Sequence, residues 1–100
     1  MSLNLHSLDV DELFNAILSL KNIDECYKFF EDLATIGEIL SMAQRLQIAK
    51  RLITKTTCLE ICEELGASTA TISRVKRYLE YGSGGYGMIL VRLGEKNIGK

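Results

Sequence analysis

The segment from Ser68 to Tyr78 begins with small hydroxyl side chains and continues with cationic ones. Hydroxyl groups can donate or accept hydrogen bonds at several base edges, and the methyl group of Ala70 can contact a thymine methyl. Cations suit phosphates, although Arg74 or Arg77 could instead bind guanine through a bidentate contact. The predicted DNA-contacting residues are Thr57, Ser68, Thr69, Ala70, Thr71, Ser73, Arg74, Lys76 and Arg77.

Residues 57–80 also meet the demands of a helix-turn-helix, in which two short helices cross steeply through a tight turn. The small Cys62 permits close helix approach, Gly66 suits a turn residue with positive φ, and Ser68 can cap the second helix. The predicted inward residues are Leu59, Ile61 and Leu65 on the first helix and Ile72, Val75 and Leu79 on the second. This spacing predicts a nucleic-acid-binding motif.

Other interpretations of the same surface stay open. The outward residues could merely solvate the second helix. A helical protein-interaction module that retains the motif without binding DNA is the alternative from another functional class. An RNA-binding protein that uses the same basic surface is a third interpretation.

The charge of the chain is segregated along its length. The total of 12 basic and 13 acidic residues argues against a nucleic-acid-binding protein, because such domains are usually basic. However, residues 1–40 carry a net charge of −6, residues 41–77 carry +4, and residues 78–100 carry +1. The positive charge therefore lies in the segment that contains the predicted motif, which favours an anionic partner.

The elements that must position this motif are predicted to be helices. The chain has 100 residues, no proline and eight glycines, which indicates one all-α domain over residues 1–100. No apolar run approaches the length of a membrane span, and the start lacks the pattern of a signal peptide. We therefore expect a cytoplasmic protein with no membrane partner.

Four stretches begin with a side-chain acceptor followed three residues later by Glu, a pattern typical of helix starts. They are Asp9 to Glu12, Asn22 to Glu25, Thr35 to Glu38 and Thr57 to Glu60. Near the other end of the chain, Gly82 suits the end of a helix that finishes near Tyr81. Residues 84–93 then form a last apolar stripe that is either helix or strand.

The stretch from Thr35 to Ile53 is apolar around well over half of its circumference. A helix apolar on most sides must be surrounded by other elements, and a chain this short offers few. We infer that a second copy covers part of it in an obligate homodimer. The alternative is a central helix of a monomeric bundle.

With these features the chain resembles the Trp repressor superfamily, and most closely its Trp-repressor-like branch of unestablished effector. The resemblance rests on residues 43–52 (AQRLQIAKRL), 63–74 (EELGASTATISR) and 81–86 (YGSGGY). It implies an all-helical, intertwined homodimer that presents two helix-turn-helix motifs to a palindromic operator. The implied function is sequence-specific transcriptional regulation, as a repressor, with possible gating by a small-molecule effector.

The resemblance also implies an effector site. In the Trp repressor, the residues that correspond to Thr35, Arg45 and Arg74 line the corepressor pocket. Guanidinium groups suit a carboxylate and can stack on an aromatic ring. Val75 replaces a glycine that leaves room for the indole, which argues against tryptophan as the ligand. Without a ligand, Thr35 would be a helix cap and Arg45 a member of an ion pair within the dimer.

The cysteines and the single histidine do not predict a metal site or an enzyme. Cys58 and Cys62 are one helical turn apart, but Cys26 is the only other thiol and His6 the only histidine. We expect small buried thiols, with a redox switch only if one is exposed and has a lowered pKa. No catalytic residues and no required cofactor are predicted.

Overall fold

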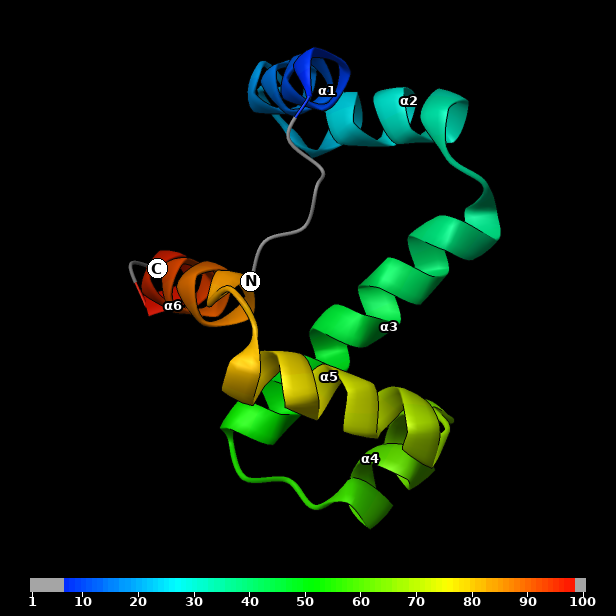
Figure 1. Cartoon of the computed structure of the whole chain (residues 1–100), viewed down its shortest axis with the longest axis vertical. Helices are drawn as coiled ribbons and strands as arrows, with labels where there is room; N and C mark the ends of the chain where they lie inside the picture. Colours follow the sequence, from blue (N-terminus) through cyan, green and yellow to red (C-terminus); the bar gives the residue numbers. More distant parts are fainter. Residues whose placement is uncertain (1–6, 99–100) are drawn as a thin grey trace. The chain divides into compact units, whose positions relative to one another are not determined.

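The computed structural model describes residues 7–98, and the side chains of residues 7–94 (Figure 1). It contains six helices: α1 (Leu8–Leu18), α2 (Ile23–Leu33), α3 (Ile36–Ile53), α4 (Cys58–Leu65), α5 (Thr69–Tyr81) and α6 (Gly85–Ile98). The all-α prediction is confirmed, and residues 84–93 contribute to a helix rather than a strand. None of the helices in the described range is long and apolar enough to cross a membrane.

The chain divides into two compact units, one running up to Ile39 and the other from Leu40 onward. The first unit contains α1 and α2, and neither helix has a fully buried side chain. The second unit contains most of α3 together with α4, α5 and α6. It holds the motif that the sequence predicts, and its own buried residues position that motif.

Three of the four predicted helix starts are confirmed by their hydrogen bonds. The Asn22 side chain accepts from the Glu25 N–H at 2.9 Å. Thr35 begins α3 through two reciprocal hydrogen bonds with Glu38. The Thr35 hydroxyl oxygen accepts from the Glu38 N–H, and the Thr35 N–H donates to the Glu38 carboxylate at 2.8 Å. Thr57 begins α4 in the same way, with Glu60 as its partner. These bonds satisfy backbone donors that a helix start would otherwise leave unpaired.

The predicted start at Asp9 is wrong by two residues. Ser7 has extended backbone geometry and its hydroxyl oxygen accepts from the Val10 N–H at 3.1 Å, so α1 begins at Leu8. Asp9 instead lies in the first turn, where a carboxylate stabilises the positive end of the helix dipole. The sequence pattern favours Asp9 because Glu12 follows it three residues later, whereas Ser7 caps the helix without such a Glu.

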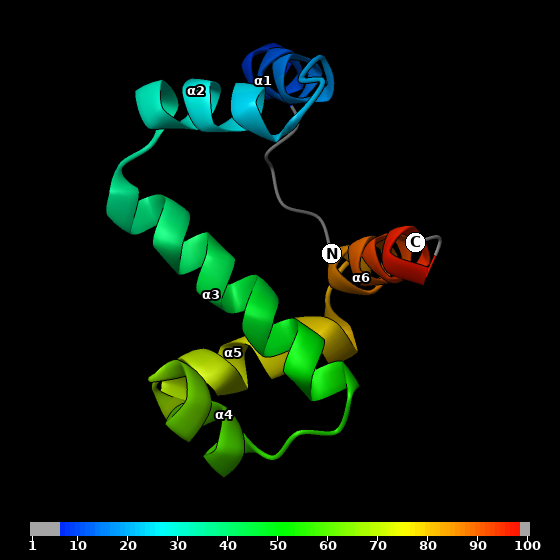
Figure 2. The ribbon, with the colours of Figure 1, turned by 180° about the vertical axis from the view of Figure 1, so that it is seen from behind.

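The buried core lies in the second unit, where α3, α4 and α5 meet (Figure 2). Its members are Ile48, Ala49, Ile61, Ala67, Ile72 and Val75. Gly66 has φ +66° and ends α4, as the sequence predicts, so the chain turns directly into the Ser68 cap of α5. The core therefore fixes α4 and α5 to the C-terminal half of α3.

One predicted inward residue of α4 is wrong. Leu59 is 69% exposed, whereas Ile61 is fully buried and Leu65 is half-buried. Residues two apart on a helix point about 200° apart, so Leu59 and Ile61 cannot share an inward face. Cys62, which packs against the core, completes that face.

The predicted end of α5 is confirmed. Its last residue is Tyr81, and the N–H of Gly82 donates to the Tyr78 carbonyl at 2.9 Å. A Cβ atom at Gly82 would lie 2.4 Å from that carbonyl oxygen. This position therefore needs glycine because of close backbone approach, although its φ is negative.

Candidate nucleic-acid interface

The outer face of α5 carries most of the predicted DNA-contacting residues. The exposed members on this helix are Thr69, Ala70, Ser73, Arg74, Lys76 and Arg77. Ile72 and Val75 are buried on the opposite side, which fixes the outward orientation of the others. The structure thus brings the hydroxyl and cationic side chains together on one helix surface.

Three further predicted contacts have local structural roles. Ser68 caps α5: its hydroxyl oxygen accepts from the Thr71 N–H at 3.1 Å, and it donates to the Thr71 hydroxyl at 3.0 Å. Thr71 is half-buried, and Thr57 donates its hydroxyl proton to Glu60 at 2.8 Å. The starts of α4 and α5 are therefore stabilised by hydrogen bonds of Thr57, Ser68 and Thr71, independently of any contact with DNA.

The N-terminal end of α5 differs electrostatically from the preceding helix starts. Helices α1 to α4 each have at least one acidic residue in the first turn, whereas α5 has none. The partial positive charge of its N-terminus is therefore not offset by a neighbouring carboxylate. Such an end is suited to an anion.

The cations of α5 form no ion pair within the described part of the chain. The described side chains contain a single ion pair, between Arg51 Nε of α3 and Glu64 Oε1 of α4 at 2.9 Å. Arg74, Lys76 and Arg77 form no such pair and lie at the surface. Their charge is available to a partner.

Two polar contacts connect the helix-turn-helix to α3, and sequence reasoning missed both. Arg51 of α3 bonds Glu64 of α4, and its Nη1 donates to Gln47 at 3.0 Å. The Gln44 side chain donates to the carbonyl of Leu65 at 3.3 Å. The partners lie 13 and 21 residues apart, so no local pattern indicates these contacts.

The predicted effector residues belong to different units. Thr35 caps α3 in the first unit, while Arg45 and Arg74 are exposed on α3 and α5 of the second. Val75, beside Arg74, is 1% exposed and packs within the buried core. The side chain of Val75 therefore fills space between α5 and its neighbours.

The prediction of buried thiols is wrong for Cys26 and Cys58, which are exposed, and Cys62 is half-buried. Burial raises the pKa of the Cys62 thiol, and the nearby Cys58 and Glu63 raise it further. A raised pKa disfavours the reactive thiolate. Among the described residues no three potential ligands gather as a metal site, and His6 lies outside them.

Comparisons with known proteins identify relatives over nearly the whole chain. A family model described as Trp repressor protein matches residues 8–94. YerC of Bacillus subtilis, described as uncharacterized, is 56% identical over 91 residues, covering 91% of this chain and 88% of its own length. A crystal structure of a TrpR-like protein from Eubacterium eligens has a TM-score of 0.88 at 57% identity, covering 90% of this chain and 93% of its own. Another crystal structure, of a Staphylococcus aureus protein proposed to be a Trp repressor, has a TM-score of 0.89 at 52% identity. The match covers 93% of this chain and 96% of the Staphylococcus aureus chain.

Proposed function

This chain belongs to the Trp repressor family, a family of DNA-binding regulators. On that basis we propose that it is a sequence-specific transcriptional repressor that binds DNA as a homodimer. The observation that carries the proposal is the outer face of α5, with its exposed hydroxyl residues and unpaired cations. In this proposal the N-terminal part of α5 enters the major groove, where Thr69, Ala70 and Ser73 contact base edges. Arg74, Lys76 and Arg77 bind phosphates or guanine.

The start of α5 supports this orientation. A helix N-terminus without first-turn acids can approach the DNA backbone without repulsion from its own side chains. The acidic segment, residues 1–40, would be repelled by DNA, whereas the basic segment that contains α5 would be attracted to it.

The homodimer is supported by apolar side chains left exposed on the second unit. On α3 and α6 these include Leu40 at 63% and Val91 at 61% exposure. A groove of about 290 Å³ between α3 and α6 is lined by Leu46, Gln47, Lys50, Ile53, Thr54, Leu90, Leu93 and Gly94. A second copy would bury these surfaces and place two α5 helices on half-sites about 34 Å apart in a palindromic operator.

We propose that DNA binding needs no corepressor. The core and the two polar contacts with α3 hold the helix-turn-helix in place using side chains of the protein alone. Val75, where the family resemblance implies a glycine that leaves room for an indole, is buried within the core, which argues against an aromatic ligand beside Arg74. An effector held by Thr35, Arg45 and Arg74 stays a prediction drawn from the family resemblance.

Selection of bound duplexes from a random pool tests the DNA-binding proposal. We expect enrichment of a palindromic sequence, with affinity that falls steeply as salt rises. Arg77→Gln should reduce the salt slope by about one unit if Arg77 contacts a phosphate, whereas Lys28→Gln on α2 should not change it. No binding to any duplex at low salt would contradict the proposal and favour a protein-interaction module.

Sedimentation at micromolar concentration tests the dimer separately. The proposal requires a single dimeric species with twice the 11.2 kDa mass of the chain. Leu40→Glu should shift that species toward monomer, because it introduces a charge into the proposed interface. A stably folded wild-type monomer would refute the dimer without bearing on whether α5 contacts DNA.

A further inference from the structure

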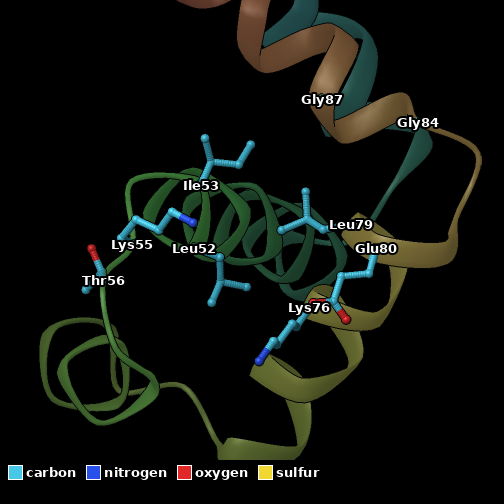
Figure 3. Close-up of a pocket in the computed structure, with 9 residues that line it drawn as sticks. All are labelled: Leu52, Ile53, Lys55, Thr56, Lys76, Leu79, Glu80, Gly84 and Gly87. Carbon is cyan, nitrogen blue, oxygen red and sulfur yellow. The ribbon is translucent and has the colours of Figure 1, made fainter.

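A second concave surface lies within the Leu40-onward unit, and Lys76 is the one residue it shares with the outer face of α5 described above. It is a pocket of about 620 Å³ between the end of α3, α5 and the start of α6. We call it the α3–α5 pocket; its lining residues are Leu52, Ile53, Lys55, Thr56, Lys76, Leu79, Glu80, Gly84 and Gly87 (Figure 3). None of the predicted effector residues Thr35, Arg45 and Arg74 lines it.

The pocket combines an apolar floor with cationic walls. Figure 3 shows Leu52 between Lys55, from the α3–α4 connection, and Lys76 of α5, with Leu79 on the side of Glu80. Glu80 also lines it, so the lining carries two cations and one anion, a net charge of +1. The volume lies within the range of small-molecule sites, which are mostly apolar with a few polar groups. This chemistry suits a singly charged organic anion.

Lys55 has a backbone conformation that its residue type does not favour. Its φ is +67°, and it is the only non-glycine residue with positive φ in the described chain. Its N–H donates to the Leu52 carbonyl and the next N–H, of Thr56, donates to the Arg51 carbonyl, which together end α3 as a Schellman motif. Glycine is the usual residue at this position, so a lysine here incurs a conformational cost while placing an ammonium group at the pocket.

We propose that the α3–α5 pocket binds a small organic anion, with a carboxylate between Lys55 and Lys76 and an apolar body on Leu52 and Leu79. The ligand would contact both α5 and the end of α3, and would partly neutralise Lys76. Any effect of the anion on DNA binding rests on the function proposed above, because it requires α5 to contact DNA. Binding of the anion to the pocket does not depend on that function.

Titration of the full-length protein with benzoate, followed by backbone amide chemical shifts, tests the pocket without DNA. Benzoate has one carboxylate and one ring, while acetate lacks the ring and benzyl alcohol lacks the charge. We expect saturable benzoate shifts at Thr56, Gly84 and Gly87, and much weaker effects of the other two compounds. Lys55→Asn, which tolerates positive φ, and Lys76→Gln should each weaken benzoate binding about tenfold.

Lys28→Gln is the matched control, since Lys28 is an exposed lysine of α2 that does not line this pocket. Equal benzoate affinity in Lys55→Asn and Lys28→Gln, or no saturable shift at all, would overturn the proposal. Pocket shifts that occur with duplex DNA but not with benzoate would overturn it too, and would assign the anion as a DNA phosphate. Benzoate binding in a protein that binds no duplex would support the pocket and refute only the DNA-binding function.

Discussion

Truncation of Val75 tests whether the inner face of α5 is part of the buried core. Val75→Ala removes two methyl groups from a side chain that is 1% exposed. At about 0.8 kcal/mol for each buried carbon, the lost transfer free energy is about 1.6 kcal/mol. The cavity left among Ile48, Ile61 and Ile72 adds about 1 kcal/mol, since these neighbours relax only partly. We expect the free energy of unfolding to fall by about 2.5 kcal/mol.

Urea unfolding followed by circular dichroism measures this difference. The variants must be compared at one protein concentration, because the proposed dimer makes stability depend on concentration. Ser73→Ala, on the exposed face of the same helix, should change the free energy by less than about 0.5 kcal/mol. If Val75→Ala were as stable as Ser73→Ala, the inner face of α5 would not be packed as described. Val75 would then not obstruct a ligand beside Arg74.

Three further perturbations test local features of the fold. Thr57→Ala should destabilise α4 by about 1 kcal/mol. In an NMR titration it should move the pKa of Glu60, now lowered by hydrogen bonds from the backbone N–H and the hydroxyl of Thr57, only part of the way toward 4.5, because alanine keeps the backbone N–H. Because the folded-state pKa is lowered, the contribution of Glu60 is present above pH 4.5 and is lost as the pH falls through the folded-state value, so wild type and Thr57→Ala should differ less in acid. Gly82→Ala should lower the midpoint of thermal unfolding, because its Cβ would meet backbone at 2.4 Å, whereas Gly85→Ala, which meets nothing within 4 Å, should not. Lys55→Gly should raise stability by about 0.5–1 kcal/mol in urea unfolding by relieving positive φ, and a loss would contradict the assignment of strain there.

The sequence predicted those parts of the fold that depend on near neighbours. The cap at Thr57 and the turn at Gly66 each involve residues within about four positions, and both are confirmed. The error at Asp9 also concerns near neighbours, because the pattern prefers Asp9, which Glu12 follows three residues later, to Ser7, which caps α1 without such a Glu. Leu59 was misplaced because its apolar character was considered without its angle around α4.

The remaining features depend on how helices pack, which one sequence does not specify. The contact of Gln44 with Leu65 joins residues 21 apart, and its polar members give no signal of pairing. The same is true of the α3–α5 pocket, in which Lys55 and Lys76 come from different elements. The predicted DNA contacts are surface residues, so their chemistry could be inferred from their types, whereas their arrangement depends on how α5 packs on the core.

The buried core described above also bears on how such a protein can change over time. Among the described side chains, those that hold α5 in place, such as Ile72 and Val75, are distinct from those on its outer face, such as Thr69, Ala70 and Ser73. In the proposed function, substitutions on the outer face should therefore alter DNA sequence preference with little loss of stability. A duplicated copy of this chain could acquire a new target site through a few such changes while its scaffold stays intact. Separation of recognition from folding makes the helix-turn-helix unusually free to diversify.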